Sequence, residues 1–105
     1  MIARIWRGIT PADKADAYLA YVGETSLKAY AGTPGSRGVT VLRRVMGDKC
    51  EIMLISLWDS MEAVRKFAGE NPEQSVYYPD DAQYLLDMEP LVRHYDVADH
   101  RVEVS

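Results

Sequence analysis

The stretch EIMLISLW, residues 51–58, decides the fold. It predicts a strand with Ile52, Leu54 and Trp58 on one face and Met53, Ile55 and Leu57 on the other. Both faces are therefore apolar. One face can lie under helices, but a chain of 105 residues has too few elements to cover the other as well. A second copy of the same sheet would bury it, so we expect a face-to-face homodimer.

Three further segments predict strands. Residues 38–45 are joined to 51–58 by the short polar turn 46–49, and a connection this short joins only antiparallel neighbours. Residues 2–9 alternate bulky side chains with arginines, and residues 91–97 predict the last strand.

Two helices are expected between these strands. Thr10 is typical of an N-cap and Pro11 of the first helical position. Gly23 interrupts the helical pattern of this first helix, so a break or bend is expected there. Asp59 is expected to cap the second helix, which ends at Gly69.

The order strand-helix-strand therefore occurs twice. This order predicts an α+β fold of the ferredoxin-like β-α-β-β-α-β type with an antiparallel sheet. The length suits one domain over residues 1–105, with a polar C-terminal tail at 98–105.

Composition excludes several classes of partner. The formal net charge of −4 and the pI near 5.1 give no attraction to phosphate backbones or anionic lipids, so we expect neither nucleic acid nor membrane partners. No apolar run approaches the roughly 20 residues that span a bilayer, and the N-terminus lacks the apolar block of a secretory signal. The single cysteine, Cys50, suits a cytoplasmic protein.

Residues 70–90 form a long, irregular connection. A short helical turn is expected after Asp80, and one of Asp80 and Asp81 is expected to serve as a cap. Loops of this length in compact domains usually have a function. Tyr77 and Tyr78 lie in this loop and could face a pocket, although loop aromatics also pack a connection onto a core.

Four short motifs resemble the antibiotic biosynthesis monooxygenase domain family, whose members are dimeric α/β barrels. They are WDS at 58–60, FAGE at 67–70, YYPD at 77–80 and RHY at 93–95. The resemblance extends over residues 2–97. The superfamily includes cofactor-free quinol oxygenases, haem-degrading oxygenases and isomerase-like members, so the resemblance is more specific for fold than for reaction.

His94 and Tyr78 are the candidate catalytic residues. His94 lies in the last strand, where a neutral imidazole could remove a proton from a phenolic or enolic substrate. The alternative is a structural histidine satisfied by a hydrogen bond to a neighbour. Tyr78, with Trp58, would hold an aromatic ring and stabilise negative charge, and Tyr77 and Phe67 complete the expected substrate-binding set.

No cofactor or metal site is expected. His94 and His100 are the only histidines, and no Cys/His cluster or glycine-rich phosphate loop accompanies them. The sequence also departs from two branches of the family. Its only asparagine, Asn71, lies in a loop, whereas quinol-type oxygenases tend to use an asparagine partner, and the Asn-Trp-His pattern of haem-degrading members is missing.

The function predicted from these residues is cofactor-independent monooxygenation of a small aromatic or quinol-type molecule. Two alternatives remain open. One is a non-enzymatic or stress-associated dimer that binds a small hydrophobic molecule. The other is an isomerase or lyase that uses His94 for proton transfer without oxygen.

Overall fold

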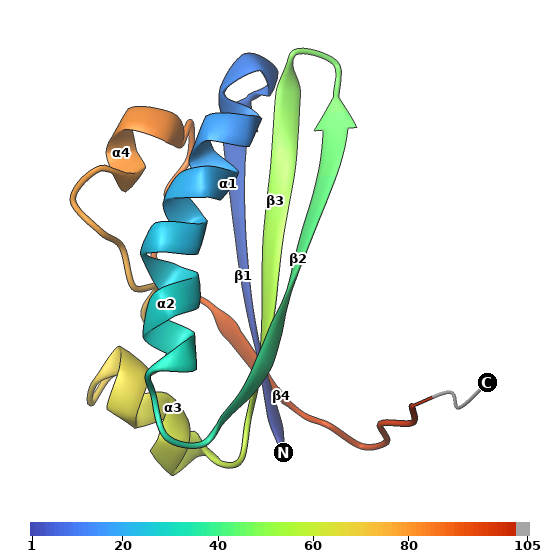
Figure 1. Ribbon diagram of the computed structural model, residues 1–105, viewed down its shortest axis with the longest axis vertical. Helices are drawn as coiled ribbons and strands as arrows, with labels where there is room; N and C mark the ends of the chain where they lie inside the picture. The colour runs from blue at the N-terminus through green and yellow to red at the C-terminus, as the bar shows by residue number, and fades with distance from the viewer. Residues whose placement is uncertain (103–105) are drawn as a thin grey trace.

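The computed structural model describes residues 1–102, which form a four-stranded antiparallel sheet in the order β2-β3-β1-β4 (Figure 1). The strands are β1 (Ile2–Pro11), β2 (Ser36–Met46), β3 (Lys49–Trp58) and β4 (Arg93–Asp96). The helices are α1 (Ala15–Glu24), α2 (Ser26–Ala31), α3 (Met61–Ala68) and the short α4 (Asp81–Tyr84). A 3-10 turn over Ala12–Lys14 precedes α1. The predicted ferredoxin-like α+β fold is confirmed.

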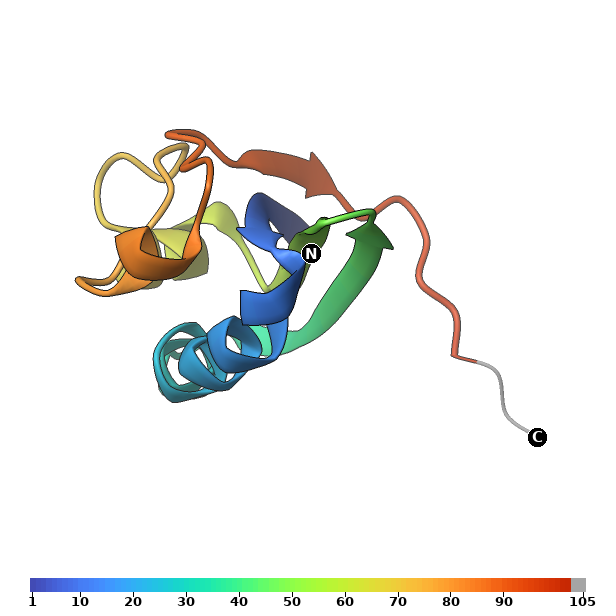
Figure 2. The same ribbon diagram turned by 90° about the horizontal axis from the view of Figure 1, so that it is seen from above.

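The helices and the 70–90 loop lie on the same side of the sheet, as the view from above shows (Figure 2). The burial of β3 follows its predicted alternation. Ile52, Leu54 and Trp58 are buried, while Met53 and Ile55 on the other face are only partly covered. The antiparallel hairpin of β2 and β3 is also as predicted. The face of the sheet away from the helices remains open, and we refer to it as the open face.

The start of the first helix differs from the prediction. Thr10 does not cap a helix, because β1 continues to Pro11, with Thr10 paired to Cys50 across the sheet. Because β3 begins at Lys49, it can pair with β1 as far as Pro11. The helix α1 therefore starts only after the 3-10 turn. The break between the helices falls at Thr25, whose hydroxyl donates to the carbonyl oxygen of Tyr21, and not at Gly23.

The cap of α3 is Ser60 and not Asp59. The Ser60 hydroxyl accepts a hydrogen bond from the backbone N–H of Ala63 at 3.2 Å. Asp59 instead pairs with Arg37 on β2, and its backbone N–H donates to the carbonyl oxygen of Gly35. The prediction was wrong by one residue because both side chains are good N-caps and the tertiary partner Arg37 was not visible from the sequence.

The C-terminal third is mostly irregular. The short helix expected after Asp80 is present as α4. The last strand is shorter than the predicted 91–97 and pairs only with Ile2–Ile5 of β1. Residues 98–102 are in no helix or strand, and positions 103–105 of the predicted polar tail lie outside the described residues. No helix within residues 1–102 is long and apolar enough to cross a membrane.

Candidate functional site

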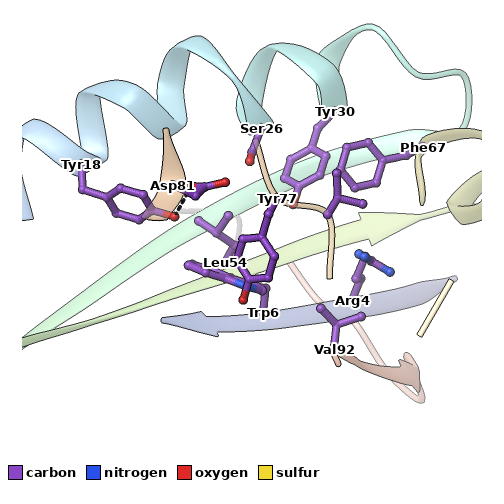
Figure 3. A pocket seen from close by; sticks show the side chains of 11 residues that line it. Arg4, Trp6, Tyr18, Ser26, Tyr30, Leu54, Phe67, Tyr77, Asp81 and Val92 are labelled. Carbon is purple, nitrogen blue, oxygen red and sulfur yellow. Dashed lines mark hydrogen bonds between the residues drawn. The ribbon is translucent and has the colours of Figure 1, made fainter. Parts of the chain in front are cut away.

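A cavity lies between the helices and the sheet (Figure 3). Its volume is about 20 Å³, which is room for about one water molecule. An aromatic ligand would therefore have to displace side chains to enter it. The cavity is lined by Arg4, Trp6, Tyr18, Ser26, Tyr30, Leu54, Phe67, Val76, Tyr77, Asp81 and Val92.

Arg4 on β1 supplies the cation in the wall of the cavity. It is 2% exposed, and its guanidinium donates to the carbonyl oxygen of Pro72, to that of Gln74 at 3.0 Å and to His94 Nε2 at 3.0 Å. Its charge centre also lies 5.7 Å from the centre of the Phe67 ring. Arg4 takes part in none of the ion pairs formed within residues 1–102. Burial lowers the pKa of Arg4, but a guanidinium remains cationic.

His94 on β4 contacts Arg4 and is not among the residues that line the cavity. A guanidinium can only donate, so Nε2 of His94 accepts and the ring proton is on Nδ1. Burial and then the charge of Arg4 lower the pKa of His94. His94 is therefore neutral at pH 7, but its lone pair is engaged by Arg4.

Aromatic rings form one wall of the cavity. Tyr30 on α2 meets Phe67 edge to face, with ring centres 4.7 Å apart, and Trp58 stacks against Phe67 at 5.7 Å. The indole N–H of Trp58 donates to the Ser56 hydroxyl at 2.9 Å, which satisfies this buried donor. Burial raises the pKa of Tyr30 to about 12, although the positive charge of Arg4 partly opposes this rise. Tyr30 therefore stays a neutral hydroxyl near pH 7.

Trp6 and Tyr77 connect the sheet to the 70–90 loop. The indole N–H of Trp6 donates to the Tyr77 hydroxyl at 3.2 Å, which in turn donates to the carbonyl oxygen of Glu89 at 2.6 Å. Gly8 makes room for the Trp6 ring, because a Cβ at Gly8 would collide with ring atoms of Trp6. These two hydrogen bonds attach the 70–90 loop to the sheet beside the cavity.

Asp81 at the start of α4 is a buried carboxylate, 4% exposed. One of its oxygens accepts from the Tyr18 hydroxyl at 2.9 Å, and the other accepts from the backbone N–H of Tyr78 at 2.6 Å. Burial, and then the charge of Asp81, raise the pKa of Tyr18. Tyr18 is therefore a hydrogen-bond donor to Asp81 and not a source of phenolate.

The structure brings together some of the residues predicted from the sequence. Tyr77 and Phe67 line the cavity, and Trp58 lies behind Phe67. His94 reaches the cavity only through Arg4, and Tyr78 is held on the loop by its backbone bond to Asp81.

Sequence reasoning missed Arg4, Trp6, Tyr18, Tyr30 and Asp81 as cavity residues. A signal existed for Arg4, because strand alternation puts it on the same face as Trp6. None existed for Asp81, whose partner Tyr18 is 63 positions away.

The described residues contain no group of three or more His, Cys, Asp or Glu side chains that could hold a metal ion. Cys50 is buried and free. The chemistry available at the site consists of one buried cation, one buried carboxylate, neutral phenols and a neutral histidine.

Solved structures share this fold over almost the whole chain. A putative antibiotic biosynthesis monooxygenase from Bacillus cereus aligns with a TM-score of 0.60 at 16% identity, over 97% of both chains. Rv0793 from Mycobacterium tuberculosis aligns with a TM-score of 0.64 at 17% identity, over 96% of this chain and 98% of the other. The heme-degrader MhuD from M. tuberculosis, with two hemes bound in its active site, aligns with a TM-score of 0.57 at 17% identity, over 100% of both chains.

No protein-family model and no curated protein matches the sequence. At these identities the likeness shows the fold alone. The chain thus has the antibiotic biosynthesis monooxygenase-type fold that its motifs suggested, and its activity has to be argued from the cavity.

Proposed function

We propose that the cavity binds a small aromatic molecule of the quinol type and that the protein oxygenates it without a cofactor. The observation that carries this proposal is the placement of Arg4. A buried guanidinium that forms no ion pair with any carboxylate of residues 1–102 lines a cavity walled by aromatic rings. Such a group stabilises an aryl oxyanion more strongly than water does, because the surrounding dielectric is low.

The reaction needs no external reductant. A 1,4-quinol C₆H₆O₂ and O₂ would give a hydroxyquinone C₆H₄O₃ and water. One oxygen atom enters the ring, the other leaves as water, and the quinol supplies all four electrons. The protein has to favour the quinol anion, which donates electrons to dioxygen more readily than the neutral quinol.

In this proposal His94 is the base. A substrate hydroxyl that enters between Arg4 and His94 would give its proton to Nε2 of His94, and the resulting oxyanion would accept from the guanidinium. The lowered pKa of His94 keeps the imidazole neutral before substrate binds, as a base must be. Phe67 and Tyr77 would contact the ring, and Trp58 supports Phe67. Tyr78 does not line the cavity, and because burial raises its pKa it would act only as a neutral hydroxyl if the loop brought it to the ring.

A heme does not fit this cavity. No histidine, cysteine or methionine lines it, and the hydroxyls of Tyr18 and Tyr77 are already donated to protein acceptors. Tyr30 is the remaining tyrosine in the wall, and its raised pKa disfavours the phenolate that would bind iron. We therefore derive no step through heme.

Two other functions use the same cavity. The hydrogen bond from Arg4 occupies the lone pair that His94 would need as a base. If a ligand leaves this bond intact, the protein would bind the ligand without catalysing a reaction. A proton-transferring isomerase or lyase would also use Arg4 and His94, but its product would form without oxygen.

We also propose that two copies pack through the open face. Ile5 and Ile55 are paired at its centre, and Leu42, 45% exposed, continues it onto β2. An apolar face of this kind is what an obligate partner covers. The single buried Cys50 suits the cytoplasm, where we propose that the protein acts.

The proposed function is tested with an oxygen electrode, a panel of 1,4-quinols and EDTA in every assay. We expect oxygen uptake above autoxidation, a loss of about 10²-fold in rate for Arg4→Gln, and no change for the exposed control Arg43→Gln. Product formation without oxygen would support the isomerase or lyase, and ligand binding without turnover would support the binding protein. Either result would reject oxygenation.

A further inference from the structure

We propose that Asp81 determines which substrates enter the cavity, by accepting a hydrogen bond from a hydroxyl at the end of the ring opposite Arg4. The inference rests on the proposed function, because it assumes an aromatic ligand. It goes further by naming the residue that selects the substrate and the position of the hydroxyl that this residue recognises. The ligand would be a single flat ring with a hydrogen-bond donor at one end and an anionic or ionisable oxygen at the para position.

The arrangement of the cavity is the first argument. Asp81 and Tyr18 lie at one end and Arg4 lies at the other, with Leu54, Trp6 and Tyr77 between them (Figure 3). The two charged groups make no ion pair with each other. The cavity therefore has a negative end, a positive end and an apolar middle.

The second argument is the unused hydrogen-bonding capacity of Asp81. Each carboxylate oxygen accepts one protein hydrogen bond, from Tyr18 or from the Tyr78 backbone, and each has a further lone pair. Asp81 takes part in no ion pair among the described residues. A buried carboxylate without a cation gains from an additional donor, and a substrate hydroxyl can supply it.

The third argument is the unused hydrogen-bonding capacity of Arg4. A guanidinium has five N–H donors, and two of them go to the carbonyl oxygens of Pro72 and Gln74. The donor that now goes to His94 is released when the substrate oxygen enters between the two side chains, so three donors are available to an oxygen at this end of the ligand. A 1,4-quinol satisfies both ends at once, with one hydroxyl donated to Asp81 and the other oxygen, once ionised, facing Arg4. A second anionic group would instead meet the carboxylate of Asp81 and be repelled.

Asp81 also has a structural role, because it ties the 70–90 loop to α1 through Tyr18. The test must therefore separate selectivity from folding. Three stable probes do so by isothermal calorimetry at pH 7: 4-hydroxybenzoate carries a donor opposite its carboxylate, benzoate lacks the donor, and terephthalate carries a carboxylate at both ends.

For the wild type we expect 4-hydroxybenzoate to bind about tenfold or more tightly than benzoate, as a hydrogen bond to a charged group allows, and terephthalate to bind more weakly than both. Asp81→Asn should reduce the preference for the hydroxyl and relieve the rejection of terephthalate. The exposed neighbour Asp80→Asn is the matched control and should keep the wild-type ranking.

An unchanged ranking in folded Asp81→Asn would overturn the inference, as would equal binding of the three probes by the wild type. If Asp81→Asn does not fold, nuclear Overhauser effects on the wild type decide. Ring protons beside the hydroxyl of 4-hydroxybenzoate should contact Tyr18, and those beside its carboxylate should contact Phe67, while the reverse orientation would reject the inference.

The two proposals fail in different ways. Oxygen uptake with quinols, together with no probe selectivity, would remove the role of Asp81 alone. The absence of both oxygen uptake and aromatic binding would remove the proposed function as well.

Discussion

Arg4 Nη1 lies 3.0 Å from His94 Nε2 across the β1–β4 pair, where the two residues stand opposite each other in register. Because the guanidinium only donates, the contact requires a neutral imidazole. Protonation of His94 would place two positive charges side by side in a half-buried position. The protonation state of His94 therefore affects both the stability of the fold and its contact with Arg4, the cation in the cavity wall.

The first prediction is a pH dependence of stability that originates at His94. Its pKa in the folded protein lies below the ordinary value of 6.5, so the unfolded chain binds more protons as pH falls below 6.5. The free energy of unfolding should therefore decrease with falling pH until the folded-state pKa is passed, and should show no such contribution above 6.5. Urea unfolding between pH 5 and 8 measures it.

His94→Gln should remove this contribution, because the amide oxygen can accept from Arg4 but does not titrate. The exposed His100→Gln is the control and should leave the pH profile as in the wild type. An identical pH profile for His94→Gln and the wild type would show that the contact with Arg4 does not set the protonation of His94.

The second prediction concerns the cap of α3. Ser60→Ala removes the acceptor for the Ala63 N–H and should lower the free energy of unfolding by about 1 kcal/mol. Asp59→Ala breaks only an exposed pair with Arg37 and should change stability little. Chemical denaturation of both variants checks the assignment, and the opposite ranking would restore Asp59 as the cap.

Local sequence patterns were enough to predict the third strand and its hairpin. The apolar residues on both faces of 51–58 predicted the strand and a sheet face that the helices leave uncovered, and the short turn at 46–49 predicted the antiparallel hairpin. The identity of the cap depended on the distant Arg37, and the extension of β1 through Thr10 depended on pairing with β3. Local propensity could therefore predict neither the cap of α3 nor the end of β1.

The same limit applies to the candidate site. Tyr77 and Phe67 were predictable, because a long aromatic loop and the inner stripe of a helix both face a core. The contact between Arg4 and His94 joins positions 90 residues apart, and that between Tyr18 and Asp81 joins positions 63 apart. Only the sheet register and the folding of the loop bring these side chains together.

The third prediction uses Gly8. A Cβ at this position would lie 2.7 Å from Cζ2 of Trp6 and about as close to Leu85 as a contact allows, at 3.0 Å. Gly8→Ala should therefore shift the indole, weaken its bond to Tyr77 and loosen the 70–90 loop. Hydrogen exchange of the loop amides should accelerate. Gly23→Ala is the control, because a Cβ there meets nothing within 4 Å, and its loop exchange should match the wild type.

The fourth prediction concerns assembly. Light scattering at micromolar concentration should give about twice the chain mass of 11.8 kDa. Ile55→Glu on the open face should dissociate or unfold the protein, because it puts a charge into the proposed interface. Leu86→Glu, on an exposed side chain of the loop, should leave the mass unchanged. A well-folded monomer of the native sequence would contradict the proposed packing.

The central claim is oxygenation by the protein alone, and mass spectrometry of a quinol incubated with ¹⁸O₂, EDTA and purified protein tests it most directly. The expected result is a hydroxyquinone that carries one ¹⁸O atom in its new hydroxyl, with the second label in water, and a yield reduced by Arg4→Gln but not by Arg43→Gln. A product without label, or a yield equal in wild type and Arg4→Gln, would contradict the claim.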